Sequence, residues 1–230
     1  MAKRHLALLG FLFVALMCST GEAKEKYVTR DGSVYYTYWT FSFGQQSHEL
    51  PQVDAASFKQ VKGWLGRDNR HVYFKERLVE GADPVTLKAD KYPLCHDAND
   101  YYHKGEPLHV ASVKDFVVLK WSDDNFWARD GRYAYYNTRR IEGVDLKSFK
   151  VTSHCSAVDG EHVYRYGKLL PLADPKTYVE DWKGFYSRDK AHIWYMGELL
   201  KDADYDSFVV DGDSDAHDKF GSFKRGERVK

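Results

Sequence analysis

The sequence lacks an excess of charge of either sign, because 34 lysine and arginine residues balance 34 aspartate and glutamate residues. This balance argues against a nucleic-acid partner and against a polybasic membrane-binding surface. The sequence also lacks a glycine-rich phosphate loop, an HExxH pair and a nucleophile elbow. We therefore expect a protein without catalytic residues, cofactor or metal. A hydrolase whose two carboxylates meet only in space is the least favoured alternative.

Long apolar runs are missing too. The longest, Leu6 to Cys18, covers 13 residues and is short for a helix that crosses a bilayer. Lys3 and Arg4 precede it, and Gly21-Glu22-Ala23 follows with small residues at the two positions that a signal peptidase reads. The pattern predicts a signal peptide over residues 1–23, one domain over residues 24–230, and no transmembrane segment after cleavage.

The signal peptide implies a periplasmic or secreted protein. Cys18 leaves a lipoprotein open as a minor alternative, although Met17 stands where a small residue is normally needed before the acylated cysteine.

Cysteine is scarce, with three residues in the chain. Once Cys18 leaves with the signal, Cys95 and Cys155 form an even pair in an oxidising compartment, and we expect a disulfide between them. Two buried free thiols are the alternative. A zinc site made by Cys95-His96 and His154-Cys155 is disfavoured, because adjacent residues on a strand point to opposite faces.

Aromatic residues are abundant, and they belong to a repeat. Seven aspartates, at spacings of 37, 29, 33, 29, 30 and 29 residues, are each followed five residues later by an aromatic. The aspartates, which we call the anchors, are Asp31, Asp68, Asp97, Asp130, Asp159, Asp189 and Asp218; the aromatics are Tyr36, Tyr73, Tyr102, Tyr135, Tyr164, Trp194 and Phe223. Such a period is the signature of a repeat architecture.

Each part of the repeat has a local structural interpretation. The anchor and the Gly or Asn that often follows it are typical of a turn between two strands. Gly105, Gly167, Gly197 and Gly226 indicate a second turn and a third short strand. Asp83-Pro84 and Asp174-Pro175 resemble a helix N-cap followed by proline, and predict one short helical turn.

These elements predict a mainly β fold of small antiparallel meanders that bury their aromatic faces by stacking. The units begin near residues 27, 64, 93, 126, 155 and 185, with a partial unit near 214. We favour an elongated solenoid-like stack over a propeller-like closed ring.

The pattern Asp189-Lys190 followed by Trp194-Tyr195 resembles the DKNYY repeat family, as do Asp68-Asn69 with Tyr73-Phe74 and Asp130-Gly131 with Tyr135-Tyr136. The likeness spans most of the chain from about Tyr27 onward. It implies a bacterial secreted or envelope protein with a repeat fold, and it implies no catalytic residue.

Two further patterns are assigned to the scaffold. His71, His162 and His192 share one repeat position, and this recurrence favours a structural role over a metal or acid–base role. The acidic segment Asp211–Asp218 resembles the start of a calcium loop, but Ala216 and Ser222 stand where an EF-hand needs Gly and Glu. A solvated acidic linker is the favoured interpretation.

Two insertions interrupt the period, within residues 38–52 and near residues 120–127. Insertions in repeat proteins usually map to loops, often on a binding face. We favour capping of the array end by Trp39, Phe41 and Phe43, and packing for the second insertion.

If the protein has a binding surface, the residues that we select for it are Trp39, Phe41, Phe43 and Trp121. The expected partner is another envelope protein. Cell-wall glycan, stacked on exposed aromatic faces, is the alternative partner.

Overall fold

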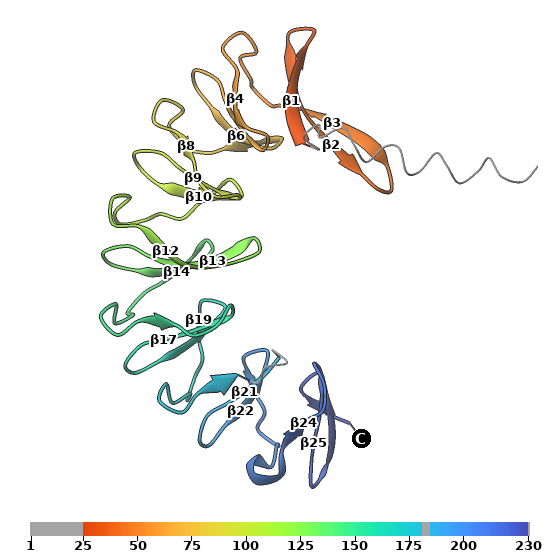
Figure 1. The fold of residues 1–230 in the computed structure, drawn as a ribbon, viewed down its shortest axis with the longest axis vertical. Coiled ribbons are helices and arrows are strands. Elements are labelled where there is room, and N and C mark those ends of the chain that lie inside the picture. Colours follow the sequence, from red (N-terminus) through yellow and green to blue (C-terminus); the bar gives the residue numbers. More distant parts are fainter. Residues whose placement is uncertain (1–24, 181–184, 230) are drawn as a thin grey trace, which may run out of the picture. The chain divides into compact units, whose positions relative to one another are not determined.

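The structure is a computed structural model that describes residues 25–180 and 185–229. The expected signal peptide and Cys18 therefore lie outside the described residues. The chain divides between Ala89 and Asp90 into two compact units, which are described separately. Almost every regular element is a short strand, which confirms the mainly β fold of small antiparallel sheets (Figure 1).

The first unit begins with a three-stranded sheet in the order β1-β2-β3 and continues with a four-stranded sheet in the order β4-β5-β6-β7. Their strands are β1 (Glu25–Arg30), β2 (Ser33–Thr40), β3 (Gly44–Glu49), β4 (Lys59–Lys62), β5 (Leu65–Arg67), β6 (Val72–Phe74) and β7 (Arg77–Val79), and β8 (Lys88–Ala89) ends the unit. Neighbouring strands are antiparallel and follow chain order, so each sheet is a meander.

The second unit repeats this plan. It opens with β9 (Leu94–His96), β10 (Tyr101–His103) and β11 (Glu106–Pro107). Two meanders follow: β12 (Val117–Ser122), β13 (Asn125–Arg129), β14 (Ala134–Tyr136) and β15 (Arg139–Ile141), then β16 (Lys150–Val151), β17 (Ser156–Val158), β18 (Val163–Arg165) and β19 (Lys168–Leu169).

The last two meanders complete the unit. They are β20 (Val179–Glu180), β21 (Tyr186–Arg188), β22 (Ile193–Tyr195) and β23 (Glu198–Leu199), then η1 (Tyr205–Ser207), β24 (Val209–Val210), β25 (Asp215–Asp218), β26 (Gly221–Lys224) and β27 (Glu227–Arg228).

The predicted helical turn is seen as a helix only once among the described residues. Asp204 caps the 3₁₀ helix η1 by accepting the backbone N–H of Ser207. At Asp54, Asp145 and Asp174 the backbone forms only a single turn, closed by an i to i+3 hydrogen bond. At Asp174 the Tyr178 N–H adds an i to i+4 bond at 2.9 Å, and the chain then enters a strand.

The hydrophobic cores lie between consecutive sheets rather than inside one sheet. In the second unit, for example, Trp127 and Ile141 of one meander pack with Ala157 and Tyr164 of the next. An aromatic four residues after the capping aspartate fills the space between two sheets. After Asp204 this aromatic is Phe208, whose ring centroid lies 5.6 Å from that of Tyr186 and 5.4 Å from that of Phe223. A single meander could not bury these faces alone, because a small isolated sheet has no second layer to cover it.

Both insertions lengthen hairpins instead of forming loops. The first extends the β2–β3 hairpin, whose strands pair from Tyr35–Glu49 to Thr40–Gly44. The second extends the β12–β13 hairpin, with Asp123 in the left-handed region at its turn. The expectation that insertions map to loops was wrong here, because alternating β-branched and aromatic residues favour continued strand pairing.

The turn before β19 gives a prediction about packing between repeats. Gly167 has φ of 72°, and a Cβ there would lie 2.7 Å from the Tyr136 Cβ of the preceding meander. Gly167→Ala is expected to lower the free energy of unfolding by about 2–3 kcal/mol, from backbone strain and overpacking together. Urea unfolding followed by fluorescence measures this.

The matched control is Gly143→Ala, because Gly143 has φ of 71° and nothing within 4 Å of the added Cβ. Only the backbone strain remains there, so the expected loss is about 1 kcal/mol. Equal losses for the two variants would show that contact between the repeats does not limit residue 167.

Candidate functional site

Several buried aspartates of the repeat each accept four hydrogen bonds. Asp130 shows the pattern. Its Oδ1 accepts the backbone N–H groups of Arg132 and Tyr133, both at 2.7 Å. Its Oδ2 accepts the Tyr135 hydroxyl at 2.6 Å and the backbone N–H of Ala111 at 2.7 Å. The anchor therefore fixes its own turn, the central aromatic and the preceding loop together.

The same bonds recur at other anchors. Asp68 and Asp159 accept two turn N–H groups, the hydroxyl of the tyrosine five residues on, and the N–H of the aspartate fourteen residues earlier. At these sites the anchor carboxylate holds its own turn through these bonds. The sequence interpretation missed the hydroxyl bond, although the preference for tyrosine over phenylalanine at this position was a signal for it.

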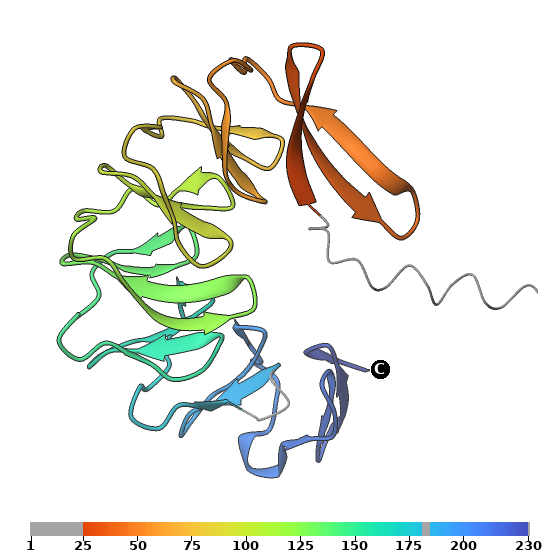
Figure 2. The ribbon, with the colours of Figure 1, turned by 45° about the horizontal axis from the view of Figure 1, so that its top comes forward.

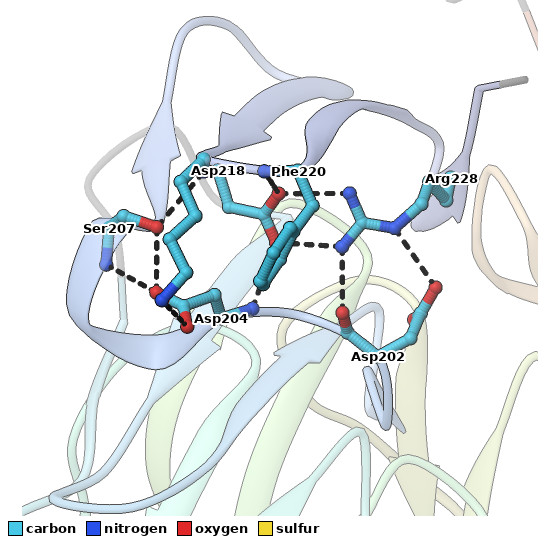
Figure 3. Close-up of polar contacts among 7 residues, drawn as sticks. Asp202, Asp204, Ser207, Asp218, Phe220 and Arg228 are labelled. Carbon is cyan, nitrogen blue, oxygen red and sulfur yellow. Dashed lines mark hydrogen bonds and ion pairs between the residues drawn. The ribbon is translucent and has the colours of Figure 1, made fainter.

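Where the aromatic five residues after the anchor has no hydroxyl, another side chain bonds to the anchor carboxylate instead. In the last meander Phe223 occupies that position, and Arg228 donates to both carboxylate oxygens of Asp218, at 2.9 and 2.7 Å (Figure 3). Arg228 also donates to the backbone carbonyl of Asp202 at 2.7 Å. In the preceding meander, where Trp194 replaces tyrosine, His192 Nδ1 lies 3.2 Å from Asp189 Oδ1.

At several anchors these hydrogen bonds lower the pKa of the carboxyl group. Burial by itself raises the pKa of Asp68, but the N–H groups of Asp54, Arg70 and His71 and the Tyr73 hydroxyl outweigh it and lower the pKa to about 2. The pKa values of Asp130, Asp159 and Asp189 are lowered by the same balance. A carboxylate with all its lone pairs occupied and a depressed pKa is a poor general acid or base, so the anchors serve the fold.

The first anchor is an exception. Asp31 lies in the left-handed region (φ 51°) in the exposed two-residue turn between β1 and β2. In the later repeats the anchor instead closes a longer turn, as in the bond from the Asp68 N–H to the His71 carbonyl. Asp31 is thus a hairpin-turn residue and has no buried carboxylate.

The recurring histidines lie at the anchors. His71 Nδ1 is 3.5 Å from Asp68 Oδ2 and His162 Nδ1 is 3.3 Å from Asp159 Oδ1, but neither nitrogen is hydrogen-bonded, whereas His192 Nδ1 bonds to Asp189. All three imidazoles therefore face a carboxylate that already holds its turn. This placement supports the structural role predicted for them.

The predicted Cys95–Cys155 disulfide was wrong. Both thiols are free, with Cys95 buried on β9 and Cys155 half-buried just before β17. An even number of cysteines says nothing about distance, and the whole meander β12–β15 comes between them in the chain. Burial, with the charges of Asp90 and Asp97, raises the pKa of Cys95 to about 12, so this thiol is a poor nucleophile.

The acidic segment near the C-terminus is part of a hairpin. Residues Asp215–Asp218 form β25, and Asp211 Oδ2 pairs with His217 Nδ1 at 2.7 Å. The favoured interpretation as a solvated linker was therefore wrong for the second half of the segment. Over residues 25–180 and 185–229, no three His, Cys, Asp or Glu side chains are grouped to hold a metal ion.

A half-open cavity of about 470 Å³ lies between β20 and β24 in the second unit. Two charged side chains line it, Glu180 and Arg188, and Glu180 is already engaged, because its Oε1 lies 2.6 Å from Arg165 Nη1. The Ser187 hydroxyl at its wall is buried. The cavity offers no convergent set of free charged groups, and we do not place a site there.

The clearest candidate is the tip of the β2–β3 hairpin, which we call the aromatic tip: Trp39, Phe41 and Phe43. These side chains are 57 %, 93 % and 81 % exposed. Their exposure contradicts the capping role that we favoured, because capping aromatics would pack against the core of the first unit. That core contains Tyr27, Val34, Tyr36, Leu50 and Tyr73 instead.

The hairpin holds the aromatic tip in place. Thr40 pairs with Gly44, and its hydroxyl accepts the Phe43 N–H at 3.2 Å. The Trp39 and Phe41 rings meet edge to face, with centroids 6.4 Å apart. The tip is thus a folded feature of fixed register rather than a loose loop.

Trp121 does not share these properties. It is half-buried against Phe126, at 5.2 Å between ring centroids, and Lys91 Nζ lies 4.9 Å from its ring centre. Phe126 and Trp127 in the same insertion are buried. The packing interpretation of the second insertion is confirmed for these residues, and we leave Trp121 out of the candidate surface.

Comparison with known families decides the relationship that the repeat suggested. The model of the DKNYY family matches residues 27–198. The chain belongs to the DKNYY family. The matched region holds the repeats of this DKNYY protein from β1 to the start of β23, and the Arg228–Asp218 contact of the last meander lies beyond it.

Two further comparisons, with curated proteins and with solved structures, found no protein similar to this DKNYY protein. None of the helices in the described residues is long and apolar enough to span a membrane.

Proposed function

We propose that this DKNYY protein is a non-catalytic secreted or envelope protein that binds another protein of the bacterial envelope through its aromatic tip. The observation that supports the proposal is the exposure of three large aromatic side chains on one ordered hairpin. Exposed aromatic clusters of this kind mark interaction sites in soluble proteins.

The composition of the tip suits a protein partner. Tryptophan and other aromatics supply much of the binding energy in protein interfaces, because they bury a large area with few rotatable bonds. No charged residue lies between Trp39 and Gly44, so docking would not strip water from a charge within the tip. Cell-wall glycan remains the second candidate, because exposed rings also stack on sugars.

The location and the array shape belong to the same proposal. The apolar run with its Gly21-Glu22-Ala23 boundary supports export to the periplasm or beyond. The cores shared by consecutive meanders in each unit support stacking of the repeats, and we propose an open, solenoid-like stack rather than a closed ring. Small-angle scattering of the purified protein tests this part through its maximum dimension.

The binding proposal is tested by site-specific photo-crosslinking in living cells. A photoreactive phenylalanine analogue replaces Phe41, and the adducts are identified by mass spectrometry. We expect one dominant protein adduct. Adducts only to glycan would support the alternative, and no adduct above the background of the same analogue at exposed Leu172 would contradict both.

Affinity for the partner so identified is then measured with purified proteins. Phe41→Ala is expected to weaken binding by about thirtyfold, the cost of a typical interface anchor. Leu172→Ala removes an exposed apolar side chain of the second unit and is expected to leave the affinity unchanged. An unchanged affinity for Phe41→Ala would overturn the role of the tip.

A further inference from the structure

The hairpin that carries the aromatic tip also presents an open sheet edge. Strand β3 is the outer strand of the three-stranded sheet and pairs only with β2 (Figure 2). Leu50 donates its N–H to the Val34 carbonyl at 2.8 Å, which sets the alternation of the ladder. In an antiparallel pair every second residue bonds to the neighbouring strand, so His48 and Gln46 bond to β2 as Leu50 does. The N–H and C=O groups of Gln45, Ser47 and Glu49 therefore point away from β2.

No other backbone group in the described ranges bonds to these outward groups. The one side-chain contact is weak: Gln46 Nε2 lies 3.3 Å from the Gln45 carbonyl. The opposite edge differs, because the Tyr27 N–H on β1 donates to Gln60 Oε1 at 2.9 Å. The open edge of the sheet is therefore β3.

Natural proteins usually protect such an edge with proline, lysine, a bulge or a very short strand. Strand β3 has none of these four devices, and its one carboxylate is Glu49. The strand is six residues long, reads Gly-Gln-Gln-Ser-His-Glu, and pairs with β2 without a bulge. Proline first appears at Pro51, just past its end.

We propose that β3 pairs antiparallel with β3 of a second copy of this chain, with Ser47 opposite Ser47 on the two-fold axis. In this register Gln45 faces Glu49 at both ends, and all three outward residues of each strand bond across the interface. Two three-stranded sheets become one six-stranded sheet.

Charge and strand length select this register. Glu49 is the one carboxylate on β3; its Oε1 accepts the Ser33 hydroxyl at 2.6 Å, and Arg30 of β1 donates to Ser47 Oγ at 2.8 Å. A shift that placed Glu49 opposite Glu49 would set like charges against each other, which destabilises a pair. A slide of two residues, half of the slide that pairs the two Glu49 residues, would place Pro51 opposite Gln45. Pro51 has no N–H to donate. The Ser47 register avoids both, because each Glu49 carboxylate meets a glutamine amide.

The dimer goes beyond the proposed binding function and uses different atoms. It engages the backbone of β3, whereas the aromatic tip consists of the side chains of Trp39 on β2 and of Phe41 and Phe43 in the turn. Because the two strands run in opposite directions, the two tips point to opposite ends of the joined sheet. The pair would therefore present the aromatic tip twice.

The test is the mass of the purified protein across a concentration series, by sedimentation equilibrium. We expect a concentration-dependent dimer. Ser47→Pro removes an outward N–H and no bond to β2, so it should abolish the dimer; Ser47→Ala keeps the N–H and should preserve it. Unchanged thermal unfolding of both variants shows that the hairpin still folds.

The register has its own test. Gln45→Lys should tighten the dimer, and Gln45→Glu should weaken it, each by about fivefold, because residue 45 faces Glu49 twice. A protein that stays monomeric at every concentration, a dimer that survives Ser47→Pro, or equal effects of the two substitutions at residue 45 would overturn the proposal. Loss of partner binding in Phe41→Ala with an intact dimer separates this result from the proposed function.

Discussion

Asp130→Ala is expected to lower the free energy of unfolding by about 4 kcal/mol. The substitution leaves the N–H groups of Ala111, Arg132 and Tyr133 and the Tyr135 hydroxyl without their common acceptor. Each buried donor without a partner costs about 1–3 kcal/mol, and some regain water at the turn. Urea unfolding at neutral pH, followed by tryptophan fluorescence, measures the loss.

Two companion variants divide this effect. Tyr135→Phe removes one hydrogen bond to an ionised group and should cost about 2 kcal/mol. Asp213→Ala removes an exposed carboxylate outside the anchor pattern and should change stability by less than about 0.5 kcal/mol. A loss for Asp130→Ala no larger than that for Asp213→Ala would show that the anchor does not tie the repeat together.

Acid is expected to unfold the protein between about pH 4 and pH 2. The pKa of Asp68 falls from 3.8 to about 2 on folding, and the pKa values of Asp130, Asp159 and Asp189 fall as well. A carboxyl group with a lower pKa in the folded state stabilises the fold above its unfolded pKa. That contribution disappears as pH drops through the folded value, by about 1.4 kcal/mol per pH unit for each proton bound.

Several anchors titrate in the same window, so the decline of stability with pH should be steep. Urea unfolding measured at steps from neutral pH to pH 2 gives the slope. Asp130→Asn has one proton fewer to bind, so it should be less stable than the wild type at neutral pH and approach it as pH falls. Parallel curves for the two proteins would contradict the role of the anchor charge.

The period of the sequence was enough to predict the meanders and their stacked cores. Aspartates with a preference for turns recur beside aromatics with a preference for strands, and both preferences are local. The positions of Phe208 and Trp127 between consecutive sheets follow from the same argument, because a small sheet must bury its aromatic face against a neighbour.

Pairings between distant residues were beyond local reasoning. The Ala111 N–H reaches Asp130 across 19 residues, and Arg228 replaces a missing hydroxyl at Asp218 across ten. The expected disulfide was wrong for the same reason, because an even number of cysteines does not show that two of them lie close together in the fold. Capping by the first insertion was wrong because the composition of Trp39, Phe41 and Phe43 does not reveal whether a hairpin turns them toward the core or away from it.

The sequence by itself determined the repeat, its turns and the family, since each depends on residue types at fixed spacing. Only the tertiary structure decided which features are available to a partner. It buried six of the seven anchor carboxylates among hydrogen-bond donors, turned the first insertion into a hairpin with an exposed aromatic tip, and left β3 as an open edge. Exposure and unsatisfied backbone groups depend on what packs against a segment, and that is a property of the folded chain.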